Sequence, residues 1–251
     1  MNAARALLPG SVLAVASKLC KTAGRDFLLL VAAALVGAAA GPATRAGDAG
    51  EYTFTVLKDG APVGRHRFDF DREGDRVEIQ EATEIEVSFA TIPLYTFEHQ
   101  AREVWENGRA LRIDSTTNDN GEKLKITVRP GDHGYIRTVN GRVDKFDGSM
   151  RVLGFWNKEI LKHHEFFSTV EDKTMQVSFQ RIGWERITVA GKELDAEHYR
   201  MVGNEERDLW FDADGHLAKI EFRRHGADIA YVRDQLAPLR PVPAASCTIA
   251  C

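Results

Sequence analysis

Two adjacent histidines, His163 and His164, lie among acidic residues in the stretch FWNKEILKHHEFF, residues 155–167. Imidazole and carboxylate groups are common zinc ligands and common partners in acid–base catalysis. Neighbouring side chains point about 100° apart on a helix and about 180° apart on a strand, so the two imidazoles cannot easily face one metal ion. Glu159 and His163 do have the i, i+4 spacing of helical metal ligands, which leaves a two-ligand site as one alternative.

The same stretch also has the spacing of an amphipathic helix. Its apolar residues recur at intervals of three and four, with lysines on the opposite side. This pattern predicts a helical segment near 155–167 that packs against a core, with one histidine turned inward and the other toward solvent. The candidate ligand-binding residues in it are Trp156, Ile160, His163 and Phe167.

Other candidates for acid–base chemistry are dispersed along the chain. Glu81 falls on the apolar face of the segment 76–90, where a buried carboxylate needs a partner. An inward pair of Glu81 with Arg102 could be a structural ion pair, a ligand anchor or a catalytic group, whereas a strand end or bulge would let Glu81 reach water. Glu81 and His198 are the candidate catalytic residues, with Glu98 as an alternative partner of His198. Glu98 and Arg102 are also candidate ligand-binding residues.

Sequence motifs of several enzyme classes are absent. The chain contains no G-x-S-x-G, no phosphate-binding glycine loop and no C-x-x-C. The segments DADG at 212–215 and NDNGE at 118–122 resemble calcium loops but are too short, so hairpin turns are predicted there. We expect neither a cofactor nor a bound metal, and catalytic activity stays an open alternative.

The dominant hydrophobic period after residue 50 is two, which is typical of half-buried strands. In RVEIQEATEIEVSFA, apolar and polar residues alternate over most of fifteen positions. Asp-Gly and Asn-Gly dipeptides, which favour tight hairpins, follow at short intervals. Strands are predicted at 51–58, 63–72, 76–90, 94–106, 109–118, 123–130, 134–139, 142–146, 175–182, 185–190, 194–202, 207–212, 216–224 and 228–235.

This pattern predicts an all-β domain over 48–237. Because hairpins join sequence neighbours, the sheet should be mainly antiparallel, and because twist accumulates, so many strands should curve strongly or close like a barrel. The helical segment near 155–167 would be its plug or lid.

The N-terminal residues 1–46 have the composition of a secretory signal peptide. The uncharged run FLLLVAAALVGAAA follows basic residues and precedes small ones, with cleavage after Ala40 or Ala46. An uncleaved membrane anchor is the alternative. Removal of this segment would leave 28 basic and 36 acidic residues, a net charge of −8, which argues against nucleic acid as a partner. We therefore expect a periplasmic or secreted protein.

The C-terminal residues 238–251 are rich in Pro and Ala and predict a disordered tail. Cys247 and Cys251 fall in this tail, and the sequence leaves their pairing open. Two cysteines so close to the chain end could not staple the domain.

Four segments carry a resemblance to a known class: FTVLKDGAPVGRHRFDF, VWENGRALRIDSTTNDNGEKLKITV, DLWFDADGHLAKIEFRRHG and IAYVRDQL. The chain resembles exported bacterial proteins of the "domain of unknown function" class, whose sheets are similar to those of the periplasmic lipoprotein carriers LolA and LolB. This resemblance implies a curved sheet around a helical plug, with a concave apolar face for a lipid-like ligand. It supplies no catalytic residues, and the lipobox expected of LolB-like lipoproteins is absent.

Three hypotheses about function follow. The first is an exported protein that binds an apolar or amphipathic small molecule in the concave face. The second is a cavity hydrolase or isomerase that uses Glu and His residues. The third is a structural or partner-binding protein of the envelope that has no small-molecule ligand.

Overall fold

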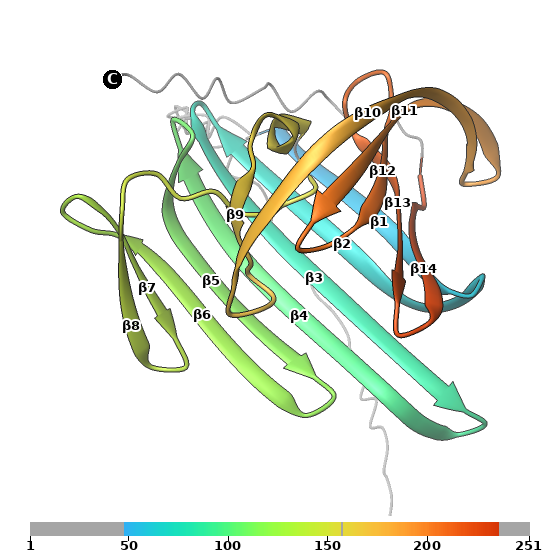
Figure 1. Cartoon of the computed structure of the whole chain (residues 1–251), viewed down its shortest axis with the longest axis horizontal. Helices are drawn as coiled ribbons and strands as arrows, with labels where there is room; N and C mark the ends of the chain where they lie inside the picture. The colour runs from blue at the N-terminus through green and yellow to red at the C-terminus, as the bar shows by residue number, and fades with distance from the viewer. Residues whose placement is uncertain (1–47, 157, 236–251) are drawn as a thin grey trace, which may run out of the picture. The chain divides into compact units, whose positions relative to one another are not determined.

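Fourteen antiparallel strands form one sheet in the computed structural model, which describes residues 48–156 and 158–235 (Figure 1). The strands are β1 Asp48–Lys58, β2 Ala61–Glu73, β3 Arg76–Phe89, β4 Ile92–Glu106, β5 Arg109–Asp119, β6 Glu122–Pro130, β7 Gly134–Val139, β8 Arg142–Asp147, β9 Glu165–Phe167, β10 Thr174–Val189, β11 Lys192–Gly203, β12 Arg207–Phe211, β13 Leu217–Arg224 and β14 Ala227–Arg233. The predicted signal peptide and tail lie outside the described residues. The predicted all-β, antiparallel and strongly curved fold is confirmed.

Strand order follows the chain in two runs that meet in the middle of the sheet. The order is β8-β7-β6-β5-β4-β3-β2-β1-β14-β13-β12-β11-β10-β9, so β1 pairs with β14. Apart from β8 and β9, consecutive strands are neighbours in the sheet, and most of them are joined by tight turns. Asp59, Asn107, Asn120 and Asn140 each have a φ of 47–50° and precede a glycine of positive φ, as two-residue hairpin turns require.

Two predicted strands are one. The segments 175–182 and 185–190 belong to the continuous strand β10, which contains a register shift between Arg181 and Gly183. Gly183 has a φ of 148°, a conformation that side chains disfavour, and the irregularity interrupted the period-two pattern. The prediction also lacked β9, because three residues are too few for a periodic signal.

The helical segment predicted near 155–167 is present, but it is shorter than expected and is not an α-helix. Among the described residues, helical structure is limited to the 3₁₀ segment η1 (Lys158–Lys162), while Glu165–Phe167 forms β9. A spacing of three and four fits a 3₁₀ turn as well as an α-helix over so short a stretch. No helix within the described ranges is long and apolar enough to cross a bilayer.

The concave face of the sheet holds the main core. Buried side chains from β1 to β3 pack with others from β10 to β13, because the curvature brings these strands face to face (Figure 1). Ile160 from η1 is 6% exposed and belongs to the same cluster, so the crossing segment fills part of the hollow. A second cluster joins β5, β6 and β7 to Phe167 of β9.

Side chains hold the region of β9 against β7 and β8, although β8 and β9 are the two ends of the sheet order. Asp172, in the turn between β9 and β10, pairs with Arg137 of β7 at 3.2 Å and with Arg142 of β8 at 2.7 Å. The Oγ of Ser115 on β5 donates to the carbonyl oxygen of Thr169 in this turn at 2.8 Å. The sheet is thus closed like a barrel through ion pairs and packing.

Candidate functional site

A cavity of about 580 Å³ opens at one end of the concave face. Its wall is formed by the β2–β3, β4–β5 and β6–β7 turns together with the crossing segment between β8 and β9. Apolar and aromatic side chains line most of its inner part, namely Val77, Trp105, Tyr135, Met150, Val152, Trp156, Ile160 and Phe166. Small-molecule sites in proteins are typically about 300–1,000 Å³ and mostly apolar, so this cavity has the size and lining of one.

One carboxyl group is buried in this apolar wall. Glu103 is 1% exposed, and its Oε2 accepts a hydrogen bond from Nε1 of Trp105 at 2.8 Å. Burial raises the pKa of Glu103 to about 7, and the hydrogen bond from Trp105 opposes this rise. Among the described residues Glu103 forms no ion pair. The cavity therefore contains a carboxyl group that gains or loses a proton near neutral pH.

The mouth of the cavity carries charges of both signs: Arg72, Asp75, Arg109, Asp132, His133, Arg151, Glu159 and His163. Both carboxylate oxygens of Glu159 lie 2.8 Å from Nζ of Lys162. Burial lowers the pKa of His163, and the nearby Arg151 lowers it further. A ligand in this cavity would thus meet an apolar interior and a polar rim.

A row of polar side chains crosses the concave face beyond Glu103. Nδ1 of His66 lies 2.7 Å from Oγ1 of Thr83, and Nδ1 of His99 lies 2.9 Å from Oγ1 of Thr117. Burial lowers the pKa of His66 to about 3 and that of His99 to about 4, so both rings are neutral at pH 7. Nε2 of His99 is buried without a hydrogen-bond partner among the described residues.

Glu81 lies between this row and Glu103. It pairs with Ala101 across β3 and β4, while Glu103 pairs with Ile79, which makes the two glutamates diagonal neighbours on one face. Burial raises the pKa of Glu81 to about 8, and Glu103 adds to the rise. Both groups therefore favour the protonated form more than an ordinary carboxyl does.

A second cavity, of about 480 Å³, opens elsewhere on the sheet, near the β13–β14 turn. Its apolar lining includes Val56, Ile85, Val87, Tyr95, Phe97, Phe222, Ile229 and Tyr231. The tip of the β3–β4 hairpin lies nearby in sequence and exposes Phe89 (74%), Ile92 (63%) and Leu94 (62%).

Three of the predicted ligand-binding residues, Trp156, Ile160 and His163, line the cavity of about 580 Å³. Within the pair of adjacent histidines, His163 lies at this cavity and His164 is exposed. Phe167 instead packs in the second core cluster, where its ring centroid lies 4.9 Å from the guanidinium carbon of Arg137. Its neighbour Phe166 lines the cavity. Their roles in binding stay predictions.

Glu98 and Arg102, also predicted for ligand binding, point away from the concave face. Alternation along β4 places them opposite His99 and Glu103, and both are exposed. Nε of Arg102 lies 2.7 Å from a carboxylate oxygen of Glu78, so the expected Glu81–Arg102 pair does not form. The assignment of Glu98 and Arg102 to the cavity is therefore wrong. Side chains alternate between the two faces of a strand, and this alternation places both residues on the face opposite to the cavity.

His198 does not meet Glu81 or Glu98. Its ring nitrogens lie 2.8 Å from carboxylate oxygens of Glu185 and Asp208, and the ring stacks on Trp210 at 4.4 Å. The adjacent residue Tyr199 packs against the main core, so His198 points to the other face of β11. The expected cavity pair of His198 with a glutamate is wrong.

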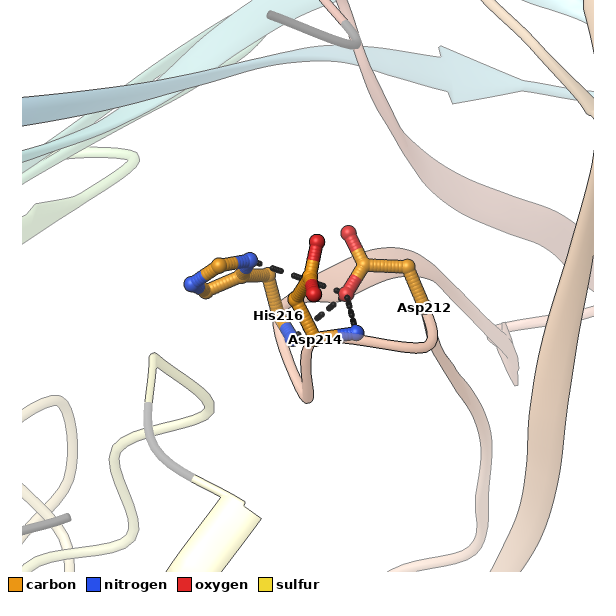
Figure 2. A group of neighbouring side chains, drawn as sticks. All are labelled: Asp212, Asp214 and His216. Atoms are coloured by element: carbon orange, nitrogen blue, oxygen red, sulfur yellow. Dashed lines mark hydrogen bonds and ion pairs between the residues drawn. The ribbon is translucent and has the colours of Figure 1, made fainter. Parts of the chain in front are cut away.

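The loop DADGH brings Asp212, Asp214 and His216 close enough to hold a metal ion (Figure 2). Oδ1 of Asp212 already accepts backbone hydrogen bonds from Asp214 at 3.1 Å and His216 at 2.8 Å. Oδ2 of Asp212 pairs with Nη2 of the buried Arg233 at 2.8 Å. These contacts lower the pKa of Asp212 to about 2 although burial opposes them, and they fit the predicted hairpin turn better than a metal site.

The sequence prediction missed Glu103. The signal was present, because Glu103 continues the alternation of Phe97, His99 and Ala101 toward Trp105. A charged residue at a core-facing position of a strand is costly unless the fold satisfies it, so it indicates a special site.

Comparisons with known proteins identify the family of this chain and a solved structure with a similar fold. Neither description names an activity. A family model described as "Domain of unknown function (DUF6134)" matches residues 54–234. The chain is similar to a solved structure titled "Crystal Structure of Beta-barrel-like Protein of Domain of Unknown Function DUF1849 from Brucella abortus". The identity is 8%, the match covers 74% of this chain and 94% of the other, and the TM-score is 0.52. No curated protein matches. The resemblance to lipoprotein carriers stays a prediction.

Proposed function

Since the chain belongs to the DUF6134 family of domains of unknown function, whose description names no activity, we propose a function from the geometry. The protein binds an amphipathic small molecule in the concave face of its sheet. The observation that carries this proposal is the cavity of about 580 Å³, with aromatic walls and a charged mouth.

The cavity walls explain why an amphipathic ligand is favoured over a polar one. A polar molecule would leave hydrogen-bonding groups unpaired against Val77, Ile160 and Phe166, which costs free energy. An apolar chain would remove these side chains from water and gain about 25 cal/mol for each Å² of apolar surface buried. The charged groups at the mouth would remain in contact with solvent, and a polar head could pair either with them or with the carboxyl group of Glu103 in the wall.

The crossing segment gives the cavity one wall that lies outside the fourteen strands. Trp156 packs edge-on against Phe70 of β2 at 5.8 Å between ring centroids, and Ile160 is anchored in the main core. This segment therefore acts as a plug that narrows the hollow to the size of a small ligand. Together with the N-terminal sequence, this proposal gives an exported carrier or receptor for such a molecule.

The direct test is extraction. Gentle purification of the protein followed by mass spectrometry of extracted small molecules should find one amphipathic species at a stoichiometric level. Repeated absence of any such molecule, together with a co-purifying envelope protein, would instead support the structural, partner-binding alternative.

A second test uses the tryptophans of the cavity. Decyl glucoside added below its critical micelle concentration should change the fluorescence of Trp105 and Trp156, which line the cavity. Trp156→Phe should reduce this change. The matched control is Trp184→Phe, since Trp184 is 54% exposed outside the cavity. Equal changes in both variants would contradict binding at this site.

The pKa of Glu103 near 7 favours a second candidate, an acid–base enzyme in the same cavity. Under this alternative, Glu103→Gln would be inactive and accumulate substrate. The molecule extracted from the variant would then differ in mass from the molecule extracted from the wild type. Identical extracted molecules would favour a binding protein.

A further inference from the structure

We propose that the cavity of about 580 Å³ recognises a cationic nitrogen, and that Glu103 binds this group among the aromatic side chains that surround it. This inference rests on the proposed function, because it names the class of amphipathic ligand. The ligand would carry an ammonium or alkylated ammonium group on an apolar body.

The first argument is the charge balance inside the cavity. Glu103 is 1% exposed and accepts a single hydrogen bond, from Trp105, without an ion pair among the described residues. A buried carboxylate is costly unless a positive charge compensates it. Glu159 at the mouth differs, because Lys162 already lies 2.8 Å from both of its carboxylate oxygens.

The second argument is the aromatic lining. Trp105, Tyr135, Trp156 and Phe166 line the same cavity as Glu103. The face of an aromatic ring attracts cations, and proteins recognise quaternary ammonium groups with cages of such rings. Arg109 shows that cations approach this lining, since its guanidinium carbon lies 5.8 Å from the centroid of the Tyr135 ring.

The third argument concerns the alternative anionic ligand. A negative head beside the ionised carboxylate of Glu103 would place two charges of the same sign in a buried site, which is unfavourable. The titratable groups that line the cavity besides Glu103 are Arg72, Asp75, Arg109, Asp132, His133, Tyr135, Arg151, Glu159 and His163. The charged side chains among them are of both signs and line the mouth, and within the described ranges none of them forms an ion pair with Glu103.

Binding of three decyl probes tests the inference. Decyltrimethylammonium, decyl glucoside and decyl sulfate share one chain and differ in head-group charge. The wild-type protein should bind the cation about ten-fold tighter than the glucoside, since both a charge pair and ring contacts contribute. Decyl sulfate should bind weakest.

The decisive variant is Glu103→Gln, which keeps an oxygen that can accept from Trp105 but removes the charge. The variant should bind the cation and the glucoside with similar affinity, while its glucoside affinity stays at the wild-type value. Glu98→Gln is the matched control, because it removes an exposed acid of the same strand β4 on the face opposite to the cavity. It should keep the preference for the cation.

Proton exchange in the wild-type protein keeps the test independent of how well the variant folds. Calorimetry at pH 7 in two buffers of different ionisation enthalpy measures protons released or taken up on binding. A cation stabilises the ionised carboxylate, so decyltrimethylammonium should release protons. A neutral hydrogen-bond acceptor would instead stabilise the protonated form and cause proton uptake.

The failures of the two proposals are distinguishable. Equal binding of cation and glucoside by the wild type, equal loss of preference in both variants, or proton uptake with the cation would overturn the cation site. The proposed function would survive each of these results. Absence of binding for all three probes would overturn both.

Discussion

Arg137 of β7 and Asp172 of the β9–β10 turn form an ion pair, with 3.2 Å between Nη2 and Oδ1, that holds the two ends of the sheet order together. Arg137 is 7% exposed, and its guanidinium carbon also lies 4.9 Å from the ring centroids of Phe146 and Phe167. The closure of the sheet therefore depends on one buried cation with partners on three elements.

Replacement of this cation should weaken the closure. Arg137→Met should lower the free energy of unfolding by about 2–4 kcal/mol, because carboxylates lose a buried partner. Urea unfolding measures this change. The matched control is Arg186→Met, whose pair with Asp195 has both side chains at least 65% exposed and should change stability little. Equal effects of the two substitutions would contradict the role of Arg137.

The raised pKa of Glu81 predicts a loss of stability toward alkaline pH. The folded state holds the Glu81 proton up to about pH 8, whereas an ordinary Glu releases it near 4.5. Folded protein thus binds more protons between these values, and its free energy of unfolding falls as pH rises through them. Glu81→Gln should flatten this fall and stabilise the protein by about 1–3 kcal/mol at pH 8.

Urea unfolding at pH 5 and pH 8 measures the effect of Glu81→Gln. Glu84→Gln is its control on the exposed, opposite face of β3, and it should follow the wild-type dependence on pH. If the free energy of unfolding depends on pH in both variants as it does in the wild type, Glu81 is not the group that causes this dependence.

The lowered pKa of His99 predicts that the stability of the protein falls as the pH decreases in the acid range. An ordinary His gains a proton below about 6.5, but the folded state keeps His99 neutral down to about 4 because of burial. The unfolded state binds more protons in this window, so stability should fall as pH decreases from 6.5 to 4. His99→Gln should reduce this loss, and the exposed His164→Gln should not. Thermal unfolding at both pH values checks the comparison.

Calcium should not stabilise the DADGH loop. Arg233 and two backbone N–H groups already use the carboxylate oxygens of Asp212, so a cation would have to displace them. Figure 2 shows the contacts within the loop, from Asp214 and His216. Addition of millimolar CaCl₂ should leave the melting temperature unchanged. Asp212→Ala should lower the free energy of unfolding by about 3–5 kcal/mol, because it leaves Arg233 buried without its charge partner. A calcium-dependent rise in melting temperature would count against this assignment.

Gly154 should control the position of Trp156 in the cavity. A Cβ at residue 154 would lie 2.5 Å from Nε1 and 2.8 Å from Cδ1 of Trp156, so Gly154→Ala must shift the indole. We expect decyl glucoside to bind several-fold weaker to this variant, measured by fluorescence titration. Gly50→Ala is the control, since a Cβ there meets no atom within 4 Å. Unchanged binding in Gly154→Ala would place the probe elsewhere.

Which face each predicted residue occupies could be worked out from the strand pattern. Alternation along 94–106 already separates Glu98 and Arg102 from His99 and Glu103, and the structure follows that separation. Their assignment to the ligand site failed because residue type was given more weight than period. His198 failed for another reason, since its partners Glu185 and Asp208 come from two other strands that local spacing cannot identify.

The sequence by itself determined the antiparallel sheet, because hairpin turns and period-two alternation are local properties of the chain. It also indicated that the alternation stops between residues 147 and 174, and it assigned Trp156, Ile160, His163 and Phe167 to the ligand site, of which the first three line the cavity. Only the tertiary structure decided that Glu103 meets these residues in one cavity. That meeting depends on the curvature of the whole sheet and on the path of the crossing segment, which arise from contacts between residues far apart in the chain.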